Sequence, residues 1–275
     1  VYLLPKMVEA GTRDINDDWS MVVDLTENLD SPVSYYACKD IERIENAVNK
    51  YIRSTFMLHA VQQYKRCNID EALRILKEEN NNSDAYYRVK LEVIENTLPG
   101  KDEKEFDKLD FAEMLSLFPE EDYFNKLIHV YEKSIVANRV YKYFPAFIDC
   151  VSMKNSPSML LADSRSRRHP RRGVLGSKLL ETLVQLLVLR QKEDGSYETH
   201  SLSIEDLASE ISNRYGLIIN GVHEKRFADA DVEMNAAFKV NMDAFKNKLR
   251  QIGFYTDMSD ACILQKIRPR YKLDE

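Results

Sequence analysis

The sequence predicts a mainly helical protein, in which an irregular helical bundle precedes a smaller C-terminal domain with one short β-hairpin. Glycine and proline are scarce, at eight each among 275 residues, whereas turn-rich β architectures need many of both. Hydrophobic residues make up 44% of the chain, which is enough for a sizeable core. They recur at steps of three and four along most of the sequence, as expected of amphipathic helices.

The first 38 residues contain only short apolar runs, interrupted by Pro5, Gly11 and the pair Ser31-Pro32. We therefore expect loops and short helices there. From Asp40 onward the pattern becomes helical. The positions that form one largely apolar face are Ile41, Ile44, Val48, Ile52, Thr55 and His59.

Four further stretches continue the helical pattern towards the middle of the chain, at 70–77, 85–98, 106–118 and 123–144. Pro99-Gly100 follows the second of them and is a typical helix stop. Pro145 follows the last, and the sequence predicts that it ends this helix or kinks it.

The charge distribution supports a division near residue 160, into an acidic helical domain (1–160) and a second domain (161–275). The net charge is −6. Residues 1–160 hold 20 Lys and Arg against 28 Asp and Glu, whereas residues 161–275 hold 19 against 17. This asymmetry indicates that the C-terminal part is the one that faces a polyanion.

An arginine-rich loop opens the second domain. Its basic members are Arg165, Arg167, Arg168, Arg171 and Arg172. Five guanidinium groups so close in the sequence repel one another unless solvent or anions surround them. Arginine binds phosphate in a bidentate manner. A phosphate clamp is the first interpretation. The alternatives are a loop docked on the acidic N-terminal half, a nuclear-import signal and a merely solvated stretch.

The C-terminal domain is predicted to contain three helices and then a hairpin. Residues 178–190 are apolar almost all round, which predicts a buried helix. Ser203 and Asp206 have the spacing of a capping box before a helix that Gly216 closes. The last helix has an apolar stripe of Phe238, Met242, Phe245, Leu249 and Ile252. A hairpin with strands near Phe254–Thr256 and Ala261–Ile267 follows, turning at Asp257–Asp260.

This order of helices and hairpin resembles the winged helix-turn-helix superfamily over about 177–271. The resemblance implies a recognition helix within Asp231–Ile252 and a wing tip at Asp257–Asp260. It implies DNA binding as in most members, or protein contacts as in a substantial minority. One feature departs from the superfamily, since Gly216 to Asp229 is longer than a three- or four-residue turn. Either the third helix begins early or the turn carries an insertion.

The favoured function is a non-catalytic DNA-binding subunit, with duplex DNA as the expected ligand and a protein partner bound by the helical N-terminal domain. Lysine and arginine suit phosphates and guanine, and asparagine and glutamine suit adenine. The candidate nucleic-acid-binding residues are Arg165, Arg167, Arg168, Arg171, Arg172, Lys239, Lys246, Asn247, Lys248, Arg250, Gln251, Arg268 and Arg270.

The alternative function is an assembly or scaffold subunit of a multi-protein complex, in which the winged helix contacts protein. A prokaryotic genome-maintenance or anti-phage defence system is one setting for such a subunit.

No nucleotide-binding glycine motif and no metal-ligand spacing is present, so we expect no cofactor, no metal and no enzyme activity. A nuclease site assembled from scattered carboxylates is a third possibility. Four widely spaced cysteines and the lack of a long apolar run predict a cytoplasmic chain outside the membrane.

Overall fold

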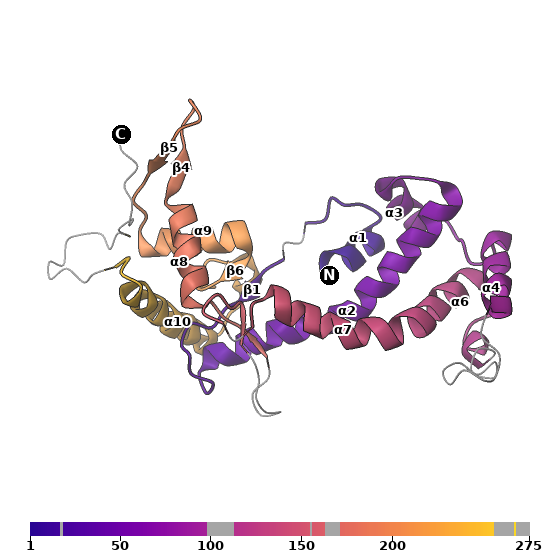
Figure 1. Ribbon diagram of the computed structural model, residues 1–275, viewed down its shortest axis with the longest axis horizontal. Helices are drawn as coiled ribbons and strands as arrows, with labels where there is room; N and C mark the ends of the chain where they lie inside the picture. The colour runs from indigo at the N-terminus through magenta and orange to yellow at the C-terminus, as the bar shows by residue number, and fades with distance from the viewer. Residues whose placement is uncertain (17–18, 98–112, 155, 163–170, 256–266, 268–275) are drawn as a thin grey trace. The chain divides into compact units, whose positions relative to one another are not determined.

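The structure is a computed structural model that describes residues 1–275 except 17–18, 98–112, 155, 163–170, 256–266 and 268–275, with backbone only for 134–142 and 145. Figure 1 shows that helices dominate it and that the strands are short. The prediction of a mainly helical fold with a small hairpin is confirmed. No described helix is both long enough and apolar enough to cross a bilayer.

The chain forms two compact units. The first comprises 1–17 and 44–147, and the second comprises 18–43 and 148–275. The sequence-based division at residue 160 assigned 18–43 to the N-terminal domain, whereas in the structure this segment belongs with the C-terminal residues. The second unit is therefore built from two separate stretches of chain.

Helices make up the first unit in the described part of the chain. Its elements are α1 (Leu3–Ala10), α2 (Pro32–Lys65) from Ile44 onward, α3 (Ile69–Glu78), α4 (Ala85–Thr97), α6 (Tyr123–Val130), the π-helical turn η1 (Tyr131–Val136) and α7 (Ala137–Val151) up to Phe147. Asn68 caps α3, because its side chain accepts a hydrogen bond from the amide of Glu71 at 2.9 Å. The core is rich in aromatic rings, with Tyr87 completely buried against Phe124.

Two expectations for the first unit and its borders need correction. Helix α2 begins at Pro32 and not near Asp40. The amide of Val33 donates to the hydroxyl of Ser31 at 3.3 Å, so Ser31-Pro32 is a helix start and not a loop. Of the two outcomes predicted for Pro145, the helix end is wrong, because α7 continues to Val151, and the kink stays a prediction. Residues 98–112, which include the start of the helix predicted at 106–118, lie outside the described residues.

The second unit combines helices with very short strands. Its elements are β1 (Met21–Val22), the start of α2, the end of α7, β2 (Leu161–Ala162), β3 (Arg172–Gly173), α8 (Ser177–Leu187), β4 (Leu189–Gln191), β5 (Tyr197–Thr199), α9 (Ile204–Tyr215), β6 (Leu217–Ile218), the 3-10 turn η2 (Lys225–Phe227) and α10 (Val232–Gln251). Helices α8 and α9 contact each other, and α9 leads into β6.

The stretch Met21–Asp24, named the N-terminal strand below, pairs with other segments of this unit on both sides. Met21 and Val22 pair in parallel with Leu217 and Ile218 of β6. On the other side the amide of Asp24 donates to the carbonyl of Gly173 at 2.9 Å. Because β3 also pairs with β2, four chain segments are joined edge to edge. The N-terminal strand therefore lies between segments that are more than forty residues apart.

This pairing explains the long connection between α9 and α10. Gly216 ends α9 with φ of 65°, as predicted, and β6 begins at the next residue. A Cβ at Gly216 would lie 2.6 Å from the carbonyl oxygen of Trp19, so only glycine fits there. The connection thus contains the strand β6 and the turn η2, and α10 does not begin early.

The predicted helices of the C-terminal part are confirmed in outline. The Ser203 hydroxyl accepts from the amide of Asp206 at 3.0 Å, and α9 buries Ile204, Leu207, Ala208 and Ile211 along one face. Tyr215, at the end of the helix, is 41% exposed. Helix α8 buries one face only, since Leu186 is 51% exposed.

The hairpin that the structure describes lies at β4–β5, between α8 and α9. The chain turns at Glu193–Gly195, and Gly195 has the left-handed φ of 84° that such a three-residue loop requires. The adjacent pair Asp194-Gly195 is the sequence signal for it. The predicted wing at Asp257–Asp260 lies outside the described residues.

Candidate functional site

Helix α10 is the element on which the predicted ligand-contacting residues converge. Asp231 caps it, accepting from the amide of Met234 at 2.8 Å. The predicted apolar stripe faces inward, with Phe238, Phe245 and Leu249 almost fully buried. The opposite side, with Asp243 and Gln251, is exposed as the periodicity predicts.

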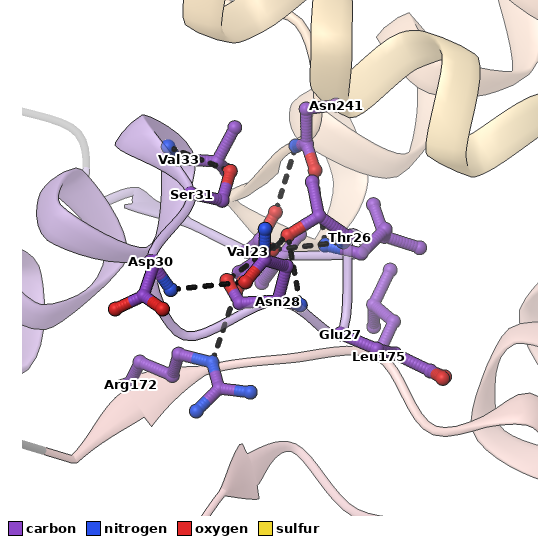
Figure 2. A network of polar contacts seen from close by, with 12 residues as sticks. Val23, Thr26, Glu27, Asn28, Asp30, Ser31, Val33, Arg172, Leu175 and Asn241 are labelled. Atoms are coloured by element: carbon purple, nitrogen blue, oxygen red, sulfur yellow. Dashed lines mark hydrogen bonds and ion pairs between the residues drawn. The ribbon is translucent and has the colours of Figure 1, made fainter. Parts of the chain in front are cut away.

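One flank of α10 that looked polar in the sequence is buried. Asn241 is completely inaccessible, and its side chain makes three hydrogen bonds to backbone groups. Its amide nitrogen donates to the carbonyls of Val23 at 2.8 Å and Ile219 at 2.9 Å, and its oxygen accepts from the amide of Leu25 at 2.9 Å. Figure 2 shows Asn241 reaching the N-terminal strand beside Val23. This side chain joins α10, the N-terminal strand and the end of β6.

Lys248 lies on the same buried flank. Its side chain is 11% exposed, and its ammonium donates to Glu27 at 2.7 Å and to the carbonyl of Leu175 at 3.3 Å. Glu27 belongs to the N-terminal segment, next to Leu175 in Figure 2. Lys248 therefore serves the fold in this structure, and its charge is not presented outward.

Arg172, a member of the arginine-rich loop, is also held inside. Its side chain is 9% exposed, and its Nε donates to the buried carboxylate of Asp24 at 2.9 Å (Figure 2). Asp24 further accepts hydrogen bonds from the amide and hydroxyl of Thr26. The preceding arginine, Arg171, is half-buried and pairs with Asp149 at 3.1 Å.

The two described arginines of the loop thus fit the alternative interpretation, in which the loop contacts the chain's own carboxylates. Asp24 and Asp149 both precede residue 160, but in the structure they belong to the same unit as the two arginines. Arg165, Arg167, Arg168, Arg268 and Arg270 lie outside the described residues.

We expect Arg172→Met to lower the free energy of unfolding by about 3 kcal/mol, because it leaves the Asp24 carboxylate buried without a cation. Urea unfolding followed by circular dichroism measures this. The double variant with Asp24→Asn should recover most of the loss. Arg171→Met is the matched control and should cost below about 1 kcal/mol, since its partner also binds Lys154. An Arg172→Met protein of unchanged stability would contradict the structural role.

The remaining candidates lie on the outward side of α10. Lys239, Asn247, Arg250 and Gln251 are exposed, and Lys246 is half-exposed, 4.0 Å from Glu205. Arg250 donates to the side chain of Asn247 at 2.8 Å and lies over the ring of Tyr255. At 100° per residue, Lys239, Lys246 and Arg250 fall on one flank of this face.

Exposed apolar residues share this face. Val232, in the first turn of α10, is 87% exposed, and Val240 is 47% exposed. The face also carries carboxylates, at Glu233 and Asp243. The face therefore combines both signs of charge with hydrophobic surface, a composition suited to contacts with another protein.

The first turn of α10 is locally acidic. The pKa of Tyr36, on α2, is raised mainly by burial and further by the negative charges of Asp231 and Glu233. Its ring packs against Tyr35, which is 56% exposed. The cations of α10 all lie in its later turns, from Lys239 onward.

Two buried polar side chains, Asn241 and Asp40, hold the elements around α10 together, and neither was predicted from the sequence. Asp40 is buried and accepts from the amide of Val22 at 2.7 Å and from Arg226 at 2.9 Å. Neither Asn241 nor Asp40 interrupts an apolar pattern in a way that distinguishes it from a surface residue. In the described part of the chain, no three His, Cys, Asp or Glu side chains converge as metal ligands would.

Comparison with known proteins identifies a family for almost the whole chain. A family model described as "Methylation-associated defense system protein MAD7" matches residues 1–271. The match includes both units of the structure. No curated protein and no solved structure matches the chain.

Proposed function

The chain belongs to the family of the methylation-associated defense system protein MAD7, and we propose that it serves there as a non-catalytic assembly subunit. In this proposal the second unit binds a partner protein of the system through the outward face of α10. The helical first unit offers a further contact surface, since Val89 and Val93 on α4 are each 53% exposed.

The composition of the α10 face is the observation that carries this proposal. Phosphate-binding surfaces concentrate positive charge, yet here Glu233 and Asp243 stand beside the cations and Val232 projects into solvent. At the same time, the positive charges of Arg172 and Lys248 are neutralised within the chain. Exposed apolar residues between charges of both signs favour a protein ligand.

Co-expression with the other proteins of the same defence system tests the proposal. We expect one of them to co-purify with the chain in a fixed stoichiometry that persists through size-exclusion chromatography. The isolated chain should not cleave or modify duplex DNA, with or without added divalent metal. Failure to form any stoichiometric complex with any component, or a metal-dependent nuclease activity, would contradict the assignment.

DNA binding is the second candidate, and it is favoured by the shared flank of Lys239, Lys246 and Arg250 on α10. It retains the winged-helix interpretation, with α10 as the recognition helix and Arg165, Arg167 and Arg168 of the loop as predicted phosphate contacts. A mobility-shift titration on duplex DNA at two salt concentrations tests it. DNA binding predicts an affinity that falls steeply with salt and weakens when the three cations are replaced by alanine. An absence of binding in dilute salt would remove this candidate.

A further inference from the structure

His129 lies near the end of α6, in the first unit, with its ring packed among other side chains. Its side chain is 16% exposed, and its Nδ1 lies 3.7 Å from the carboxylate of Glu132. The ring meets Phe118 edge to face, with 5.2 Å between the two ring centres. Its other nitrogen, Nε2, is buried and has no hydrogen-bond partner among the described residues. The carboxylate beside Nδ1 favours the neutral tautomer that carries its proton there.

Glu132 and its neighbour Tyr131 connect this place to α2. Both residues belong to the π-helical turn η1, a kind of turn that is rare and usually short. The carboxylate oxygen of Glu132 that lies near His129 also pairs with Arg53 of α2 at 3.2 Å. The ring of Tyr131 stacks on Phe56 of α2, with 5.4 Å between the ring centres. An ion pair and a ring contact therefore hold η1 on α2 directly beside the histidine.

A positive charge on His129 is unfavourable in this position. The second proton would sit on Nε2, as a buried N–H group without an acceptor. Burial lowers the pKa of His129 by more than the negative charge of Glu132 raises it, and Lys133 and Arg53 lower it further. Glu132 is the one favourable charge among these, and Arg53 already pairs with it. The charged ring is therefore more stable in water than in its packed position.

Other charged residues of the elements packed around the ring have partners of their own or are exposed. On α4, which packs against α6, Arg88 pairs with Glu92 at 3.3 Å at the surface. On α6 itself, Lys126 donates to the carbonyl of Glu120 at 2.8 Å, and Asp122 caps the helix. The remaining charged residues of α4, of the adjacent turn of α2 and of 113–121 are Lys90, which lies over the ring of Tyr86, and the exposed Lys50, Glu95, Glu113, Glu120 and Glu121.

We propose that His129 is an acid-sensitive latch of the first unit: when its ring takes up a second proton, it leaves its place beside Phe118, and α6 and η1 loosen on α2. This latch goes beyond the assembly function proposed above and does not depend on it. It would make the first unit respond to acidification before its carboxylates are protonated, since those titrate at lower pH.

The latch stabilises the fold at neutral pH and weakens in acid. The packed ring binds its second proton more weakly than a histidine of the unfolded chain, which titrates at about 6.5. The stabilisation is therefore complete above that pH, decreases as the pH falls below it, and levels off below the lower pKa of the folded chain.

An NMR titration of the histidine rings in the full chain tests the first step. The signal that is absent from His129→Phe identifies His129, and we expect its midpoint below about 6.5. Glu132→Gln keeps the shape of the side chain and removes its charge, so it should lower the midpoint by roughly another half unit. A midpoint of His129 at or above the ordinary value, or one that Glu132→Gln leaves unchanged, overturns the latch.

Amide hydrogen exchange, corrected for the intrinsic rate at each pH, tests the opening. Between pH of about 7.5 and about 5, protection of residues 123–136 should fall by about threefold or more in the wild-type chain, with α3 as the internal reference. His129→Phe, verified as folded by circular dichroism, should not show this fall. His59→Gln, an exposed position on α2, is the matched control and should retain it. Unchanged protection of the wild-type chain, or a fall that persists in His129→Phe, overturns the proposal.

Discussion

A fragment comprising residues 148–275 should not fold, whereas the same fragment joined to residues 18–43 should fold cooperatively. The N-terminal stretch supplies the strand that pairs with β6, and Val23 and Leu25 in it are buried. The first turns of α2 supply Val33 and Ala37, which pack with Phe238 of α10 in one core cluster. Without them the fragment exposes a large apolar surface to water, and each buried side chain lost costs about 1.5–3 kcal/mol.

The polar contacts strengthen this expectation. Removing residues 18–43 leaves Arg172, Arg226 and Lys248 without the carboxylates of Asp24, Asp40 and Glu27. It also leaves the side chain of Asn241 with one of its three backbone partners. Buried polar groups without partners are costly, so the loss affects the interior as well as the edge.

Thermal unfolding followed by circular dichroism, together with proton–nitrogen NMR spectra, measures the result. The joined fragment should unfold in one cooperative step and give dispersed amide signals. The fragment that lacks 18–43 should show neither. As a control, a joined fragment with Val23→Asp should behave like the shorter one, because a carboxylate would replace a completely buried side chain. A cooperative transition for residues 148–275 alone would show that the N-terminal stretch is dispensable.

Asn241→Leu should lower the free energy of unfolding by about 4 kcal/mol. Leucine has the same number and branching of side-chain heavy atoms as asparagine, but it leaves the amide of Leu25 and the carbonyls of Val23 and Ile219 buried without partners. Each such group costs about 1–3 kcal/mol. The position is completely inaccessible, so water cannot replace the lost hydrogen bonds.

Urea unfolding of the full chain gives the magnitude. The variant Asn247→Leu on the exposed side of the same helix is the control, and it should change stability by below about 0.5 kcal/mol. The helical content of the folded Asn241→Leu protein should match that of the wild-type chain, because leucine is a good helix former. If the two variants were equally stable, the hydrogen bonds of Asn241 would not hold the N-terminal strand.

Local sequence signals predicted the helices well. The Ser203 cap, the glycine after Tyr215 and the apolar stripe of α10 each depend on residues within a few positions of one another. Capping, left-handed termination and helical periodicity act over those distances, so they can be read without knowing the fold. The start of α2 at Pro32 was available by the same reasoning, and was missed because Ser31-Pro32 also begins turns.

The candidate site was predicted in part. Periodicity correctly separated the buried stripe of α10 from Asp243, Asn247 and Gln251, which are exposed. It placed Lys248 on a polar side, where the structure instead pairs it with Glu27. Arg172 likewise counted as a phosphate ligand by composition, yet its carboxylate partner is 148 residues away in the sequence. An ion pair between residues so far apart produces no periodic pattern in the sequence.

The amino-acid sequence by itself determined which segments become helices, where most of them end and which side of α10 is apolar, since short-range propensity and spacing control these features. Only the tertiary structure decided that residues 18–43 complete the second unit and that Asn241, Arg172 and Lys248 are internal. The physical reason is that a polar side chain is stable in the interior wherever the fold brings it a partner, and that partner comes from a distant part of the chain.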